Sequence, residues 1–199
     1  MPHDARSWQS ATDADVVRFA VAGDQAAREE IVRRHQAAVF RLARGLTPDG
    51  AAAEDVLQET FISALAALPG FRGESSLRSW LLAITRNAAH HHRVRAARFT
   101  PRSDDDLSSL AADAGWASTD PEAMIARVQE RQQLESAIAS LDVEDREVLL
   151  LRDVEGVSGE ETAAILTLSI PAMKSRLHRA RLRLVAQLRK GERHGTPGT

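Results

Sequence analysis

Hydrophobic residues recur along this chain every three or four positions, which is the spacing of amphipathic α-helices and not the alternation of β-strands. The clearest stretch is residues 51–68, where one helical face would carry Val56, Leu57, Thr60, Phe61, Ala64, Leu65 and Leu68. Pro69-Gly70 would end this helix. A looser pattern predicts another helix over residues 24–44, which Gly45 and Pro48 would stop.

Capping residues predict two more helices in this half of the chain. A short first helix would be capped by Asp13 or Asp15 and ended by Gly23. After a loop at residues 71–75, a further helix would be capped by Ser75 or Ser76 and run to residue 95. Residues 13–95 are therefore expected to form one small helical domain.

The C-terminal part of the pattern predicts a helix-turn-helix. Pro121 suits the first turn of a helix that runs to residue 140, and another helix would cover residues 143–155 before Gly156. Ser158 and Glu161 have capping-box spacing at the start of a short helix that ends near residue 166. After the turn Thr167-Leu168-Ser169, with Ser169 as cap, a long basic helix would cover residues 170–189.

The stretch between these halves has weak periodicity. Residues 96–120 are rich in Ser, Asp and Ala, a composition typical of a flexible linker, and Trp116 is the one residue there that suggests a contact. The tail after residue 190 is expected to be disordered. The pattern as a whole predicts an all-α protein with two small helical domains, residues 13–95 and 121–190, joined by the acidic linker 96–120.

Composition narrows the possible functions. The sequence contains no Cys, which excludes disulfides, thiolate metal sites and a cysteine nucleophile. It shows neither a Gly-rich phosphate loop nor a cluster of His and carboxylates outside the linker, so we expect no enzyme activity and no cofactor or metal. It also shows no apolar stretch of signal-peptide or membrane-spanning length, so we expect a soluble, cytoplasmic protein.

The net charge of −2 hides a strong segregation of charge. Residues 77–103 contain arginines and no acid, residues 104–122 contain acids and no base, and residues 173–193 contain eight basic residues and a single acid, Glu192. Two basic blocks separated by an acidic one predict two surfaces that face phosphates.

A helical projection of the last helix gives it two distinct faces. One narrow stripe is apolar and would pack inward: Ile170, Met173, Leu177, Ala180 and Leu184. Away from it lie Pro171, Ser175, His178 and Arg179, with Lys174 on the flank, which is the arrangement of a helix that reads the major groove with its N-terminal residues. The sides, where phosphates would run, carry Arg176, Arg181 and Arg183. Leu182 faces outward and suggests a protein contact. A solvated amphipathic helix is the alternative.

Four strings in this order resemble the extracytoplasmic-function (ECF) family of bacterial sigma factors: AGDQAAREEIVRRH, AEDVLQETFISAL, LPGFRGESSLRSWLLAITRN and EGVSGEETAAILTLSIPAMKSRLHRARLRL. The resemblance covers nearly all of residues 13–188. It implies a transcription-initiation factor that directs RNA polymerase core to specific promoters. The first domain would bind core and open the −10 element, the second would read the −35 element, and the acidic linker would thread the polymerase channel.

The resemblance also implies roles for individual residues. The positions that contact the β′ clamp helices of polymerase are matched by Asp55, Gln58, Glu59 and Phe61, which without the resemblance would be read as a solvated face and a core phenylalanine. The −10 element would be captured and opened by Phe71, Arg72, Gly73, Ser75, Arg78, Arg86, Asn87 and His90. In the last helix the family's −35 contacts fall on Lys174, Ser175, His178 and Arg179, beside Pro171 and Arg176. The second domain would also contact the β flap, and an anti-sigma factor is a further expected partner.

Two departures from the family's pattern stand out. His90-His91-His92 replaces a stretch that usually contains Leu and an acid; consecutive helical residues point in different directions, so we interpret these histidines as part of the DNA-facing surface and not as a metal site. Thr167 stands in the turn where relatives often have Gly.

Two other functions compete with this reading. A stand-alone helix-turn-helix regulator explains residues 121–190 but leaves AEDVLQETF and FRGESSLRSW unexplained. An interaction protein, such as a sigma-like decoy or an anti-sigma partner, fits poorly with two intact basic faces.

Overall fold

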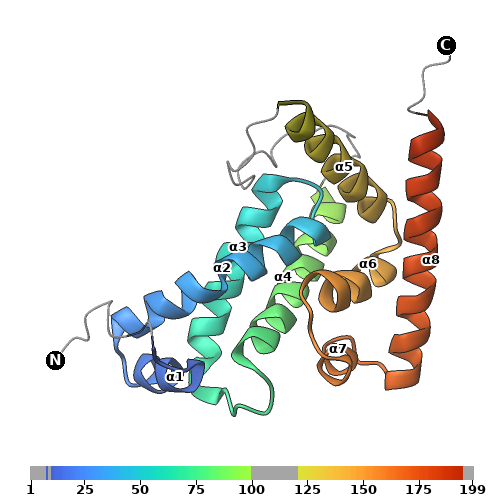
Figure 1. Ribbon diagram of the computed structural model, residues 1–199. Coiled ribbons are helices and arrows are strands. Elements are labelled where there is room, and N and C mark those ends of the chain that lie inside the picture. Colours follow the sequence, from blue (N-terminus) through green and yellow to red (C-terminus); the bar gives the residue numbers. More distant parts are fainter. Residues whose placement is uncertain (1–7, 9, 100–120, 195–199) are drawn as a thin grey trace. The chain divides into compact units, whose positions relative to one another are not determined.

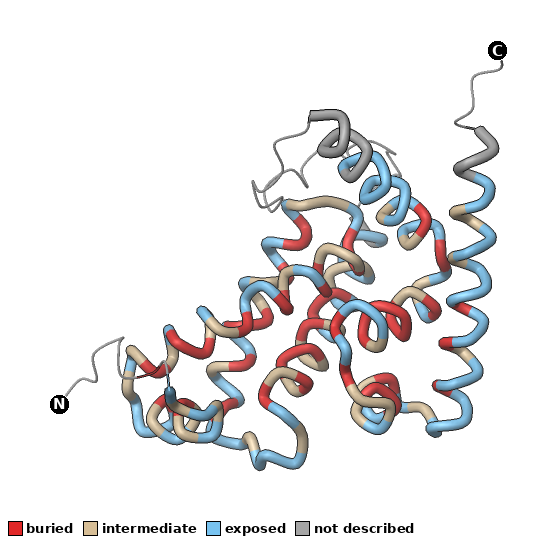
Figure 2. Tube along the Cα trace, in the orientation of Figure 1, coloured by how far each residue is buried: buried red, intermediate tan, exposed pale blue. Residues whose placement is uncertain are grey.

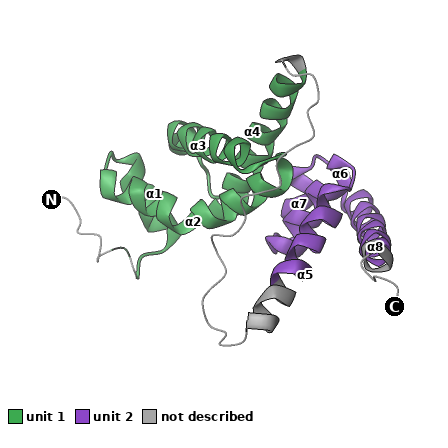
Figure 3. Ribbon diagram, turned by 90° about the horizontal axis from the view of Figure 1, so that it is seen from above, with its two compact units in different colours: residues 1–106 green, residues 107–199 purple. Residues whose placement is uncertain are grey.

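The computed structural model describes residues 8, 10–99 and 121–194, and over these ranges its secondary structure is helical, without a strand (Figure 1). This confirms the predicted all-α class. The chain divides into two compact units, residues 1–106 and 107–199 (Figure 3). The predictions for most of the linker, including Trp116 and the acidic cluster at 104–106, concern residues outside the described ranges.

Unit 1 is built from α1 (Asp13–Val21), α2 (Gln25–Leu46), α3 (Gly50–Ala67), the single 3-10 turn η2 (Leu68–Gly70) and α4 (Leu77–Phe99). Helices α2, α3 and α4 pack against one another, and α1 packs on α2. The buried centre, red in Figure 2, is formed by apolar side chains that the helices contribute from one face each, including Ile31, Val39, Val56, Phe61, Leu77 and Leu81. The predicted apolar face of α3 is thus confirmed.

Several helix ends differ from the predicted ones. Thr12, and not Asp13 or Asp15, caps α1: its Oγ1 accepts from the Asp15 amide at 3.2 Å, and the Asp15 carboxylate accepts from the Thr12 amide at 3.4 Å. The acid is therefore the third helical residue of a capping box and not the cap itself. Gly23, at φ +96°, follows the end of α1 as predicted.

Helix α2 passes through Gly45 and ends at Leu46, so the prediction that Gly45 stops it is wrong. A glycine inside a helix costs about 1 kcal/mol relative to alanine, and burial of Leu46, 5% exposed, offsets this cost. The Thr47 hydroxyl, which donates to the Ala43 carbonyl at 2.8 Å, closes the helix.

Ser76 begins α4 as predicted, since its hydroxyl accepts from the Ser79 amide at 3.0 Å, but α4 continues past Arg95 to Phe99.

Unit 2 comprises α5 (Pro121–Ala139), α6 (Val143–Leu149), the π-helical turn η3 (Leu150–Val154), α7 (Gly159–Ile165) and α8 (Ile170–His194). The single helix predicted over 143–155 is therefore α6 followed by a wider turn, and Gly156 at φ +63° ends it. Helix α8 packs against α5, α6 and α7 around the buried residues Val148, Leu151, Met173, Leu177 and Ala180. It extends four residues into the predicted tail.

A polar network joins α1 to α2 inside unit 1. Glu30, only 5% exposed, accepts from Arg33 through two bonds of 2.6 Å and from Arg34 at 2.7 Å. Arg34 also donates to the Asp13 carboxylate at 2.9 Å and to the Trp8 carbonyl at 2.5 Å. The hydrogen bond from Arg33 is the main cause that lowers the pKa of Glu30 to about 2, against the opposing effect of burial.

His35 is the titratable ring in the same place. It is buried, with its Nε2 3.4 Å from the Asp13 carboxylate. Burial lowers the pKa of His35; Asp13 opposes this shift, and the positive charges of Arg34 and Arg78 add to it. His35 is therefore held in its neutral form as the pH falls.

Candidate nucleic-acid interface

The turn between α7 and α8 has the geometry of a helix-turn-helix. Ser158 caps α7 by accepting from the Glu161 amide at 3.2 Å, and Ser169 caps α8 by accepting from the Ala172 amide at 3.3 Å, both as predicted. Between them, Thr167 adopts φ +56°, the left-handed region in which glycine is favoured. A Cβ added to Gly159 would lie 3.4 Å from the Met173 methyl carbon, so the start of α7 approaches α8 closely.

Helix α8 presents two faces, as the sequence predicts. Met173, Leu177 and Ala180 are buried, whereas Leu184 is half-buried and Ile170, at the first turn, is exposed. The opposite face is exposed over its first three turns and carries Pro171, Lys174, Ser175, His178 and Arg179. Binding in a DNA major groove requires a short capped helix, a tight turn and a long helix with an exposed basic N-terminal half, and this unit has all three.

Three arginines of α8 are held by carboxylates of their own unit. Arg176 lies 3.3 Å from Glu144, and Arg181 makes two bonds, of 2.9 and 2.6 Å, to Asp153. Arg183 bonds to Asp142 at 3.0 Å and also to Asp145. In this structure they fasten α8 to α6 and η3, and their interpretation as phosphate contacts stays a prediction.

In unit 1 the loop before α4 is anchored at one end and exposed at the other. Phe71 packs on Trp80 with ring centroids 5.1 Å apart, which holds the start of the loop against α4. Beyond it, Arg72 lies 3.7 Å from Glu74, Gly73 adopts φ +71°, and Ser75 is half-buried. The loop thus offers a short exposed backbone segment beside an aromatic pair.

The α4 residues that the sequence singles out follow this loop. Arg78 and Arg86 are half-buried, whereas Asn87 and His90 are exposed. The three consecutive histidines diverge: an Arg93 nitrogen lies 3.1 Å from His90 Nδ1, while His92 Nε2 lies 3.9 Å from the Asp55 carboxylate of α3. Over the described residues no group of His and acidic side chains could hold a metal ion.

The candidate polymerase-binding residues of α3 fall into two groups. Asp55, Gln58 and Glu59 lie on the surface, and Glu59 is 3.5 Å from Arg95 of α4. Phe61 is 7% exposed and belongs to the core, so its side chain does not lie on the surface with the other three. The sequence interpretation missed Ile62, which is 65% exposed. Its spacing from Gln58 and Glu59 could have pointed to it.

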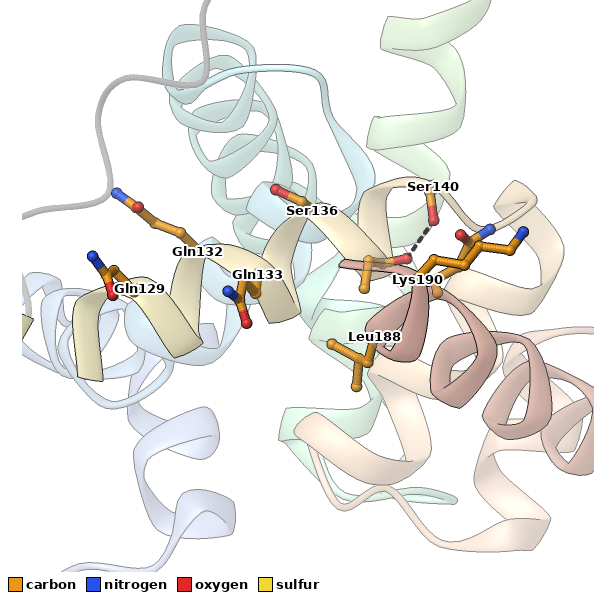
Figure 4. Close-up of a pocket in the computed structure, with 9 residues that line it drawn as sticks. Gln129, Gln132, Gln133, Ser136, Ser140, Leu188 and Lys190 are labelled. Atoms are coloured by element: carbon orange, nitrogen blue, oxygen red, sulfur yellow. Dashed lines mark hydrogen bonds between the residues drawn. The ribbon is translucent and has the colours of Figure 1, made fainter. Parts of the chain in front are cut away.

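A groove of about 490 Å³ lies between α5 and α8 (Figure 4). Within the groove Ser140 donates to the Ala137 carbonyl at 2.7 Å. The lining residues with amide or hydroxyl side chains are Gln129, Gln132, Gln133, Ser136, Ser140 and Gln187. Lys190 is the one titratable residue in this lining. The groove therefore lacks the paired acid and base of a hydrolytic site. Among the described helices, none is long and apolar enough to cross a membrane.

Comparison with known proteins supports both units independently. The family model for Sigma-70 region 2 matches residues 31–99, and that for Sigma-70, region 4 matches residues 131–184. The ECF RNA polymerase sigma-E factor of Escherichia coli (strain K12) is 36% identical over 174 residues, which cover 85% of this chain and 91% of the relative. The chain belongs to the ECF family of RNA polymerase sigma factors.

Other ECF sigma factors resemble it to a similar degree. The RNA polymerase sigma factor CnrH of Cupriavidus metallidurans is 34% identical over 181 residues, covering 88% of this chain and 95% of CnrH. The structure of CnrH in complex with the cytosolic domain of CnrY superposes with a TM-score of 0.64 at 31% sequence identity. The match covers 94% of this chain and 99% of the CnrH chain. The sigma factor RpoE, in complex with the anti-sigma factor NepR from Bartonella quintana, matches 81% of this chain and 96% of its own, also with a TM-score of 0.64, at 29% identity.

The region 2 match decides between the competing functions. It covers the strings AEDVLQETF and FRGESSLRSW, which a stand-alone helix-turn-helix regulator leaves unexplained. A regulator of that kind is therefore not favoured for this ECF sigma factor.

Proposed function

We propose that this ECF sigma factor divides promoter recognition between its two units. Residues 13–95 bind polymerase core and open the −10 element, residues 121–190 read the −35 element, and the acidic residues 96–120 connect them through the polymerase channel. The observation that carries the proposal is a capped helix-turn-helix with an exposed basic face in the same chain as a region 2 unit.

The −35 element is read by the N-terminal half of α8. Lys174, Ser175, His178 and Arg179 are exposed there and approach base edges, since Lys pairs with guanine acceptors and Ser with either base type. Pro171 contacts the backbone at the helix start. Arg176 is steadied by Glu144 at the edge of this face, so its contribution to DNA binding is partly compensated within the protein.

The −10 element is opened by the loop and by α4. Phe71, Arg72, Gly73 and Ser75 form the site that receives an unstacked base, supported by the contact of Phe71 with Trp80. The displaced strand is held along α4 by its polar and basic residues: Arg78, Arg86, Asn87 and His90.

Polymerase core is the main protein partner. The exposed side chains of Asp55 and Gln58 and the half-buried Glu59 contact the β′ clamp helices, Phe61 supports them from the core, and unit 2 contacts the β flap. An anti-sigma factor is a second partner, a proposal supported by the relatives that were solved with CnrY and NepR. The protein acts in the cytoplasm, on the nucleoid when active, and performs no covalent chemistry.

Transcription in vitro tests the proposal. The full chain is added to purified core polymerase on a promoter library, with Arg179→Ala and, as matched control, Arg189→Ala at the far end of α8. We expect transcripts from a selected promoter class that require both core and this protein. Arg179→Ala should weaken selection at the −35 element, whereas Arg189→Ala should not. DNA binding by the protein alone, without core-dependent transcripts, would contradict the proposal.

A further inference from the structure

Helix α3 carries a surface stripe, defined here as Asp55, Gln58, Glu59, Ile62 and Ala66, of which Glu59 is half-buried and the others are exposed. These positions are three or four residues apart, so they lie above one another on one side of the helix. Ile62 sits in the middle of the stripe, with carboxylate and amide groups on one side and the small Ala66 one turn further on. The buried face of α3 is formed by other residues, among them Val56, Thr60 and Ala64.

Ile62 is the most exposed large apolar side chain among the described residues, at 65%. It cannot turn inward, because its neighbour Phe61 already occupies the core at 7% exposure and consecutive residues of a helix diverge by about 100°. A single exposed apolar residue is common on protein surfaces. Its position in the centre of a polar stripe is what distinguishes Ile62.

An apolar centre surrounded by polar groups is the arrangement of a protein-binding hot spot, in which a buried anchor supplies affinity and the rim excludes water. The carboxylates of Asp55 and Glu59 exclude DNA as the occupant, because they would repel phosphates. They favour a protein surface with basic side chains around an apolar patch. On the α4 side of the stripe Arg95 donates to Glu59 at 3.5 Å, and His92 Nε2 lies 3.9 Å from the Asp55 carboxylate.

We infer that Ile62 is the apolar anchor through which α3 binds polymerase core, and that Phe61 contributes only by supporting the helix from within. This inference rests on the proposed function, which assigns Asp55, Gln58 and Glu59 to the same contact. It adds a residue that the family resemblance does not supply, and it moves the hydrophobic part of the contact from Phe61 to its exposed neighbour. The carboxylates then steer association, and Ile62 slows dissociation.

Binding of the full-length chain to purified core polymerase tests this assignment. We expect Ile62→Ala to raise the dissociation constant about tenfold or more, mainly through faster dissociation, as for an interface hot spot. Ile62→Leu, which keeps the apolar volume, should bind nearly like the original chain. Val21→Ala is the matched control: Val21 is another exposed apolar residue of unit 1, 44% exposed, and lies on α1 away from the stripe.

Folding does not obscure this test, because truncation of an exposed side chain should leave the melting temperature unchanged, which circular dichroism checks. Val56→Ala, on the buried face of α3, gives the converse case: it should lower the melting temperature while the folded protein binds core with nearly unchanged affinity. Unchanged binding by Ile62→Ala, with the original chain still binding core, would overturn the assignment of Ile62 alone. Failure of the original chain to bind core would overturn the proposed function and this inference with it.

Discussion

Two single residues of this sigma factor are held in a state that their surroundings impose: Thr167 in its backbone conformation and His35 in its charge. Thr167 has φ +56° in the turn of the helix-turn-helix, although a β-branched side chain is strained there. Burial, helped by the charges of Arg34 and Arg78 and opposed by Asp13, lowers the pKa of His35 and favours its neutral form. Both residues have surroundings that determine their state, and both allow a direct test.

Replacing Thr167 by Gly should stabilise unit 2. Strain of a non-glycine residue in this region costs on the order of 1–3 kcal/mol, and the greater freedom of glycine in the unfolded chain offsets part of the gain. We expect thermal unfolding to show a net gain of about 1 kcal/mol. The control is Ala164→Gly, in the ordinary helical backbone of α7, which should lose about 1 kcal/mol. Equal losses in both variants would show that the turn carries no strain.

The stability of unit 1 should fall as the pH drops below the ordinary value for histidine. The pKa of His35 is lowered in the folded state, so the unfolded chain binds the proton first, and the stability that neutral His35 provides is present above pH 6.5 and lost below it. Urea unfolding between pH 7.5 and 5.5 should show this decline. The decline of the unfolding free energy with falling pH should be weaker in His35→Gln. The two slopes should differ by at most about 1.4 kcal/mol per pH unit. If the unfolding free energies of the original chain and of His35→Gln ran parallel over this pH range, the prediction would be wrong.

At the scale of elements, the sequence predicts helix types and faces well and helix ends less well. The burial of one face of α3 and of Met173, Leu177 and Ala180 in α8 follows from periodicity alone, because that spacing leaves one side apolar. The end of α2 was mispredicted because the burial of Leu46 outweighs the low helix propensity of Gly45. The turn η3 has no sequence signal that separates it from an α-helix.

The candidate site shows the same division between local and long-range information. A helical projection selects the exposed side of α8, which the structure bears out as exposed. It does not indicate that Arg176, Arg181 and Arg183 pair with carboxylates, since these partners lie about 30–40 residues earlier in the sequence. The exposure of Ile62 was within reach of the sequence, because the predicted apolar face of residues 51–68 includes Phe61 and its neighbour in a helix points away from that face.

The network that joins α1 to α2 should respond to acid. The pKa of Glu30 is about 2 in the folded protein, against 4.5 for an ordinary glutamate. The ionised Glu30 carboxylate therefore stabilises the folded state by on the order of 2 kcal/mol. This contribution is complete above pH 4.5 and is lost as the pH falls toward 2. Glu30→Gln should be less stable than the original chain at pH 7, and the two unfolding free energies should converge below pH 3. Glu29→Gln, exposed on the same helix, is the control.

At the scale of the whole molecule, the proposed contact of α3 with polymerase and the proposed contact with the −35 element lie in different compact units. Ile62 belongs to unit 1 and Arg179 to unit 2, and their proposed partners are different, the β′ clamp helices and promoter DNA. Residues without shared partners contribute nearly independently to a free energy. The two units should therefore be separable by mutation even though transcription needs both.

A double-mutant cycle tests this independence. Ile62→Ala should weaken core binding and leave promoter preference unchanged, whereas Arg179→Ala should do the reverse. Their effects on core-dependent transcription, expressed as free energies, should add within about 0.5 kcal/mol. The measurement is the initial rate at subsaturating sigma factor for each single and double variant. A clearly larger deviation would mean that the two units act on a common step.

The carboxylate partners of the α8 arginines also determine how promoter binding responds to ions. DNA releases condensed counterions in proportion to the phosphates that a protein neutralises, with a log–log slope of about −0.9 per contact. Between Lys174 and Arg183 the helix has five basic residues, and the three arginines already paired with Asp or Glu leave Lys174 and Arg179 as those without a carboxylate partner in the described part of the chain. This segment should thus contribute a slope near −2 and not the roughly −4.5 that its count of charges suggests. Its affinity for the −35 element should therefore change less between low and high salt than the affinity of a helix with five uncompensated cations.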